Sequence, residues 1–128
     1  MEPEKLRHKF PINLRLNNSE DYRAVFDGSD VKVAHPGYLL LAKKNKKKYS
    51  RLGLVVGKKN LPKAFARNRL KRLVRETFRQ FSIHPSVDVV FLSRKGVADI
   101  TKQEVYSTLT KAWKRLSLKC QKLENSLD

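Results

Sequence analysis

The 128-residue chain has few acidic residues and a single cysteine. Cys120 has no partner for an intramolecular disulfide, and no group of cysteines and histidines has the spacing of zinc ligands. No apolar run approaches the ~18–20 residues that cross a bilayer. The N-terminal segment MEPEKLRHKF lacks the apolar centre of a signal peptide. We therefore expect a protein of the reducing cytoplasm.

Positive charge, in contrast, is abundant. Lys and Arg number 29 against 12 Asp and Glu, which gives a formal net charge of +17. Such a charge exceeds what solubility needs and indicates a polyanionic partner, either a nucleic acid or an anionic membrane. The length suits one domain with a single modest core. We expect one domain over residues 1–128, with flexible tails at 1–9 and 124–128.

Local patterns predict three helices and four strands. Residues 17–19 (Asn-Asn-Ser) are N-cap types, and Tyr22, Val25 and Phe26 follow with helical spacing, which predicts a short first helix. Apolar runs predict strands at 31–33, 38–42, 51–57 and 87–92. The capping-box spacing at 101–104 starts a last helix that ends near residue 123. The order helix, three strands, helix, strand, helix predicts an α+β sandwich of sheet and helices.

The central helix, predicted from Ala64 to Phe81, has one apolar and one cationic face. Nothing in this segment breaks a helix before Pro85. Steps of about 100° per residue place six residues on the apolar face: Leu70, Leu73, Val74, Thr77, Phe78 and Phe81. The opposite face carries five polar residues: Asn68, Lys71, Arg72, Arg75 and Arg79. Arg67 falls at the edge of the apolar face, and Glu76 is the only acid in the stretch.

Cations also crowd the start of this helix, where the helix dipole is already positive. Each cation in the first turn costs about 0.3–1 kcal/mol, and like charges four residues apart repel as well. A sequence selected only for stability would place acids there. A polyanion that binds at the N-terminus of the helix explains the pattern.

Other functions fit the sequence less well. A protein nuclease needs clustered carboxylates or an acid–base pair, and the acids here are scattered, so we expect neither a catalytic nor a metal site. A membrane-surface helix conflicts with the need for the apolar face in so small a core. The basic block 43–48 reads as a solvated loop or as a flexible phosphate contact. Tyr22 suits an exposed stacking position for unpaired bases, whereas Phe26 fits the core slightly better.

Residues 66–78, ARNRLKRLVRETF, resemble the RNR signature of the bacterial ribonuclease P protein component. Residues 52–60, LGLVVGKKN, are similar to the strand and turn that precede the signature, and residues 88–96, DVVFLSRKG, to the strand that follows it. Residues 19–26 are similar to the first helix of the family. The resemblance covers roughly residues 10–118. A ribosomal or general RNA-binding protein of similar charge is the alternative, and a protein-only nuclease is the third.

The resemblance implies the α-β-β-β-α-β-α fold, with a left-handed βαβ crossover, similar to the second domain of a small-subunit ribosomal protein. General rules alone favour the right hand. It also implies a cytoplasmic subunit that binds a catalytic RNA one to one. Mg²⁺ held mainly by that RNA would support hydrolytic removal of the 5′ leader of precursor tRNA. The protein itself is then not catalytic.

The resemblance also assigns site residues. The catalytic-RNA contacts by motif position are Lys59, Arg67, Asn68, Arg69, Lys71, Arg72 and Arg75. The single-stranded leader is assigned to a cleft between the sheet and the first helix, formed by Arg15, Tyr22 and Phe26. A strand position that carries an aromatic in the family is Leu41 here, and Tyr38 is expected to substitute for it.

Overall fold

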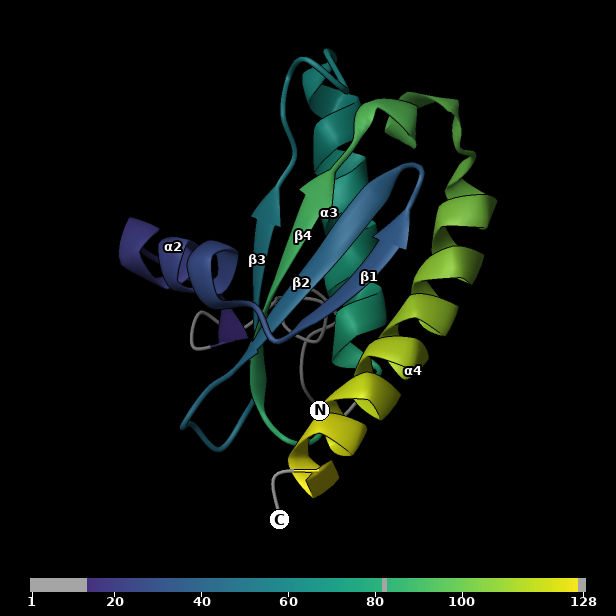
Figure 1. Ribbon diagram of the computed structural model, residues 1–128. Helices are drawn as coiled ribbons and strands as arrows, with labels where there is room; N and C mark the ends of the chain where they lie inside the picture. The colour runs from purple at the N-terminus through teal and green to yellow at the C-terminus, as the bar shows by residue number, and fades with distance from the viewer. Residues whose placement is uncertain (1–13, 82, 127–128) are drawn as a thin grey trace, which may run out of the picture.

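The computed structural model describes residues 14–81 and 83–126, which form a four-stranded sheet with helices on both faces (Figure 1). The elements in chain order are α2 (Ser19–Gly28), β1 (Val31–His35), β2 (Tyr38–Lys44), β3 (Arg51–Val55), α3 (Ala64–Arg79), β4 (Val87–Ser93), the 3-10 helix η2 (Lys95–Asp99) and α4 (Lys102–Ser126). The predicted order of helices and strands is confirmed. None of the described helices is both long and apolar enough to cross a membrane.

The sheet has the order β1-β2-β4-β3, and only the β3–β4 pair is parallel. The connection between these two strands is α3. In Figure 1 both strands point upward, β4 lies to the right of β3, and α3 passes behind them, which is the left-handed crossover. The α+β fold with this crossover is therefore confirmed. The hand places the cationic helix on the face of the sheet opposite α2.

Two apolar clusters lie on the two faces of the sheet. The larger one joins α3 and α4 to the sheet, with the side chains of Trp113, Phe91 and Leu40 fully buried. The smaller one lies beneath α2 and contains Val25 with Leu41 of β2. Residues of β2, β3 and β4 that point to opposite faces belong to different clusters, as the pleat requires, whereas β1 contributes only to the larger one. The α2 side therefore has a thin core, which leaves part of that face of the sheet accessible.

β1, β2 and β4 extend one or two residues beyond their predicted ends, and α3 ends at Arg79, two residues before the predicted end. β3 ends at Val55 rather than at residue 57, and the turn before α4 contains η2, which the sequence analysis did not predict. α4 continues to Ser126, so residues 124–126 do not belong to a tail. The predicted tails at 1–9 and 127–128 lie outside the described residues. The Thr101 hydroxyl oxygen accepts the backbone N–H of Glu104 at 3.1 Å, which confirms one half of the capping box.

Candidate nucleic-acid interface

The cationic face of α3 has exposed residues along its length, with Lys71 and Arg75 half-buried among them. Its apolar face is buried as predicted through Leu70, Leu73, Val74, Thr77 and Phe78. Among the predicted RNA contacts, Asn68, Arg69, Arg72 and, in the preceding turn, Lys59 are exposed, while Arg67, Lys71 and Arg75 are half-buried. The structure thus brings six of the seven onto one helix, with Lys59 four residues before its N-cap, Lys63.

The N-terminus of α3 has no acid in its first turn and no side-chain cap. The N-cap residue is Lys63, whose side chain makes no capping hydrogen bond. Backbone N–H groups without a side-chain cap and several cations therefore coincide at one end of the helix, which is the arrangement that attracts phosphate. Acids or a Ser, Thr or Asp cap would have stabilised the isolated helix instead.

Arg67 has a structural contact that the sequence analysis did not predict. Its guanidinium group donates hydrogen bonds to the backbone carbonyls of Leu61 and Pro62, at 3.0 and 2.6 Å. The side chain therefore holds the segment that enters α3. Its position at the edge of the apolar face, as predicted, allows this contact.

The turn before α3 is tied to the end of β4. The Asn60 side-chain amide donates to the Ser93 carbonyl at 3.2 Å, and the Gly57 backbone N–H donates to the Ser93 hydroxyl at 3.3 Å. Ser93 is buried. These bonds fix the exposed residues Lys58 and Lys59 beside the start of the helix.

On the opposite face, Tyr22 of α2 lies flat on β3. A Cβ atom built on Gly53 would come within 2.6 Å of the Tyr22 ring, so any larger residue there would displace the ring. The Tyr22 hydroxyl accepts the backbone N–H of Leu54 at 3.1 Å. β3 is an edge strand, and this bond satisfies one of its outward N–H groups. Tyr22 thus anchors α2 to the sheet.

The predicted exposures of the two α2 aromatics are reversed. Tyr22 was expected to be the exposed stacking residue and Phe26 a core residue. Tyr22 is half-buried because it packs on the glycine of β3, whereas the Phe26 side chain is 41% exposed. Val25, one residue earlier, takes the core position instead. Phe26 is therefore the accessible aromatic of α2.

The prediction that Tyr38 contributes to the leader-binding cleft is wrong. Tyr38 is 1% exposed and belongs to the large cluster on the α3–α4 side of the sheet. Its ring stacks between His35 and Phe91, and its hydroxyl donates to Thr108 of α4 at 2.9 Å. Burial raises the pKa of the Tyr38 hydroxyl. Leu41 does lie on the α2 side, but it is buried, so neither residue offers a ring to the cleft.

Arg15 and Arg75 bring the two predicted surfaces together. The chain around Arg15 pairs with β3 at Leu52, where the Leu16 N–H donates to the Leu52 carbonyl at 3.0 Å. Burial lowers the pKa of Arg75 on α3, and the neighbouring positive charge of Arg15 lowers it further. Tyr22 lies close enough to influence the same group. One cation from each predicted set, Arg15 and Arg75, therefore lies close enough for the two charges to interact.

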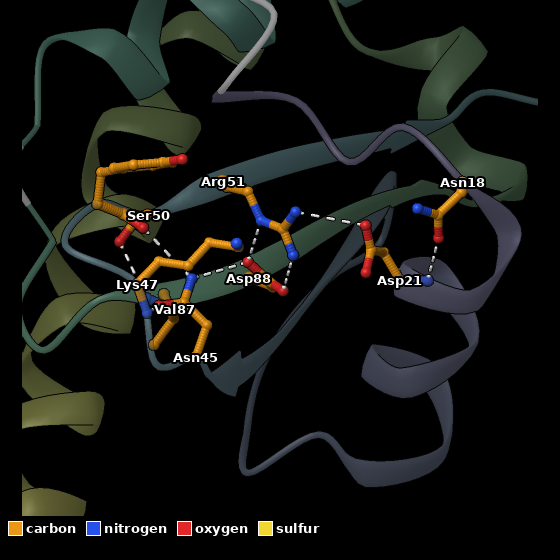
Figure 2. Close-up of polar contacts among 9 residues, drawn as sticks. Asn18, Asp21, Asn45, Lys47, Ser50, Arg51, Val87 and Asp88 are labelled. Carbon is orange, nitrogen blue, oxygen red and sulfur yellow. Dashed lines mark hydrogen bonds and ion pairs between the residues drawn. The ribbon is translucent and has the colours of Figure 1, made fainter.

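An ion-pair network joins α2 to the sheet (Figure 2). Arg51 of β3 donates two hydrogen bonds to the carboxylate of Asp88 on β4, at 2.9 and 2.7 Å, and a third at 3.3 Å to Asp21 of α2. The Asn45 amide also donates to Asp88, at 2.8 Å. Hydrogen bonding to Asp88 is the main reason that the pKa of Arg51 is raised. These contacts hold α2 beside the edge of the sheet, where the family resemblance assigns the leader-binding cleft.

The basic loop between β2 and β3 is anchored at Asn45, whose side-chain oxygen accepts the Lys47 N–H at 3.0 Å. The side chains of Lys46, Lys47 and Lys48 are exposed. Nothing in the loop separates the two interpretations given above. Within residues 14–81 and 83–126, no three His, Cys, Asp or Glu side chains lie together in an arrangement that could hold a metal ion.

Comparison with known proteins gives a consistent family. The family model described as Ribonuclease P matches residues 10–117. The ribonuclease P protein component of Marinomonas sp. is 43% identical over 114 residues, which are 88% of this chain and 86% of the relative.

Solved structures of ribonuclease P proteins have a similar fold. The ribonuclease P protein of Thermotoga maritima superposes with a TM-score of 0.69 and 32% identity, over 80% of this chain and 97% of that chain. The Staphylococcus aureus protein superposes with a TM-score of 0.72 and 26% identity, over 79% and 93% of the two chains.

Proposed function

Since the chain belongs to the ribonuclease P family, we propose that it is the protein subunit of a ribonuclease P holoenzyme. In this role it binds the catalytic RNA and the 5′ leader of precursor tRNA, and it assists endonucleolytic removal of the leader in the bacterial cytoplasm. The observation that carries the proposal is the cationic face of α3. This helix begins with no side-chain cap and with no acid in its first turn.

The catalytic RNA binds to α3 and to the turn before it. Exposed Arg and Lys side chains neutralise phosphates and release counterions, which supplies most of the affinity. Arg69 and Arg72 on the helix and Lys59 in the turn are the exposed cations among the predicted contacts. Lys71 and Arg75 add half-buried cations, Asn68 adds a hydrogen-bonding group, and Arg67 contributes mainly by holding the entering segment.

The single-stranded leader binds on the other face, between α2 and the edge of β3. Phe26 provides the accessible ring for base stacking. Arg15 provides a cation, and Tyr22 lines the floor. The half-buried side chains of Leu39 and Val55 complete an apolar surface on this side of the sheet. One protein in a one-to-one complex then contacts both RNAs, and Arg75 lies between the two sites.

Mg²⁺ in this proposal is held mainly by the RNA, and the RNA with its bound Mg²⁺ carries out the hydrolysis. The protein lowers the Mg²⁺ requirement because its cations screen the repulsion between phosphates of the two RNAs. Its own carboxylates have structural roles, as Asp88 and Asp21 illustrate.

The test is assembly with a transcribed catalytic RNA, followed by leader cleavage at saturating Mg²⁺. We expect stoichiometric binding. We also expect Glu20→Ala, Asp27→Ala and Asp99→Ala, all at exposed positions, to leave the cleavage rate nearly unchanged. A loss of about 100-fold or more from one of them would indicate a metal site in the protein. Failure to bind the RNA would contradict the proposal itself.

A further inference from the structure

Phe65, in the first turn of α3, is the most exposed large apolar side chain of the described residues. It is 60% exposed. Two cations flank its ring, the Lys63 ammonium at 5.8 Å and the Arg69 guanidinium at 5.7 Å from the centroid. A large aromatic side chain left in water between two cations adds little to folding, since it buries little area. It does provide a flat surface with phosphate-binding groups beside it.

Arg69, one of these two cations, also lines a nearby pocket. The volume of this pocket is about 220 Å³, and it lies between α3, η2 and the start of α4. The walls are formed mainly by aliphatic side chains, including Leu61, Leu70, Val97 and Ile100. The only charged lining residues are the cations Arg69 and Lys102. An apolar cavity of about 150 Å³ is known to accept benzene, so this pocket has room for a flat aromatic ring.

We propose that Phe65 and this pocket together bind a short unpaired segment of the catalytic RNA. One base stacks on the Phe65 ring, a neighbouring base enters the pocket, and Lys63, Arg69 and Lys102 contact the phosphates. The proposal rests on the proposed function, because it adds a base-binding site at the N-terminal end of the same helix. The occupant is single-stranded because paired bases do not offer a free face for stacking.

The charge and the shape of the site favour an unpaired RNA segment over an apolar peptide or a duplex. An apolar peptide would leave three cations without counterions, and a duplex would contact the cations but not the pocket. An unpaired nucleotide offers a π face and a phosphate within one unit, which matches an exposed ring flanked by cations. Phe65 precedes the signature segment 66–78, so the motif alone did not point to it.

The experiment measures the affinity of the full-length protein for transcribed catalytic RNA across a range of salt concentrations. Phe65→Ala should weaken binding by about 5- to 150-fold, the range for loss of one stacked base. The slope of log K against log salt should stay unchanged, because no phosphate contact is removed. Phe65→Trp should keep the wild-type affinity, and Phe65→Leu, which lacks a π face, should lose most of it.

Two further variants test the pocket and the specificity of the effect. Ala66→Leu, which narrows the pocket, should also weaken binding without lowering the melting temperature. Leu118→Ala removes an equally exposed side chain, 59%, from α4, and should change nothing. Methylation of the RNA by dimethyl sulfate should reveal at least one unpaired base that wild-type protein protects and Phe65→Ala does not.

The outcomes separate this proposal from the proposed function. If wild-type protein binds the RNA, but Phe65→Ala binds equally well and protects the same bases, the base-binding site is wrong and the subunit assignment stands. If Ala66→Leu alone has no effect, the pocket is not occupied. If wild-type protein does not bind the RNA, the proposed function fails first.

Discussion

Asp88 is the single charged residue inside β4, and its environment shows why a strand tolerates it. Its two carboxylate oxygens accept hydrogen bonds from Arg51 and Asn45. Both side chains of the Arg51–Asp88 pair are only 13% exposed. A buried pair of this kind adds little net stability over an apolar pair, but the loss of one partner is costly.

We therefore predict that Asp88→Asn lowers the free energy of unfolding by about 1.5–3 kcal/mol, because it removes the charge of the carboxylate that accepts two of the three Arg51 hydrogen bonds and leaves only the longer contact to Asp21. Urea denaturation measures the change. The double variant Arg51→Met/Asp88→Leu should recover most of the loss. A change below about 0.5 kcal/mol for Asp88→Asn would show that the pair behaves as a surface salt bridge.

The incorrect predictions for Tyr38, Tyr22 and Phe26 have identifiable physical causes. Residues 38, 40 and 42 of β2 share one face and residues 39 and 41 the other, so Tyr38 could not replace an aromatic at Leu41. That alternation was available in the sequence. The exchange of roles between Tyr22 and Phe26 could not be predicted from the sequence. It depends on Gly53, which is 31 positions from Tyr22 in the chain and lies beneath the ring only after folding.

At the scale of elements, α3 was predictable because its apolar face, its cationic face and its boundaries all agree with one period. The segment that enters α3, residues 57–63, was less predictable. Its geometry depends on Arg67 bonding to two backbone carbonyls and on Asn60 and Gly57 bonding to Ser93. Contacts of this kind join residues whose relation no local pattern shows.

Arg67, which holds the segment entering α3, and Arg72, which is exposed on the helix, should therefore respond differently to replacement by alanine. Arg72→Ala should leave the melting temperature unchanged, because Arg72 is exposed. It should make the salt slope of RNA binding shallower by about 0.7–0.9 units. Arg67→Ala should lower the melting temperature as well, because the Leu61 and Pro62 carbonyls lose their donor. Thermal unfolding and salt titration of both variants check this. Equal melting temperatures would contradict the structural role of Arg67.

In the proposed function, leader recognition depends on α2. Phe26→Ala should weaken binding of precursor tRNA to the holoenzyme by about 5- to 150-fold, the range for one stacked base. Mature tRNA, which has no leader, should bind as before. Phe26 suits this test better than Tyr22, whose removal also opens a hole over Gly53 and frees the Leu54 N–H. Equal weakening of both tRNAs would show that Phe26 supports the fold instead.

At the scale of the whole molecule, the sheet separates the two proposed RNA-binding surfaces, which lie on opposite faces. α3 and α4 cover one face and α2 part of the other (Figure 1). The α+β class followed from the order of the elements. The left-handed crossover did not follow from general rules, which favour the right hand, and was expected only from the family resemblance. It matters for function because it sets which face of the sheet α3 occupies.

The central claim is that this chain assists an RNA catalyst and does not itself cleave RNA. The most direct test is the rate of leader removal from precursor tRNA at low Mg²⁺, measured with the transcribed catalytic RNA alone, the protein alone, and both together. We predict no cleavage by the protein, slow cleavage by the RNA, and fast cleavage by the mixture. Leader removal by the protein alone, or a mixture no faster than the RNA, would contradict the account.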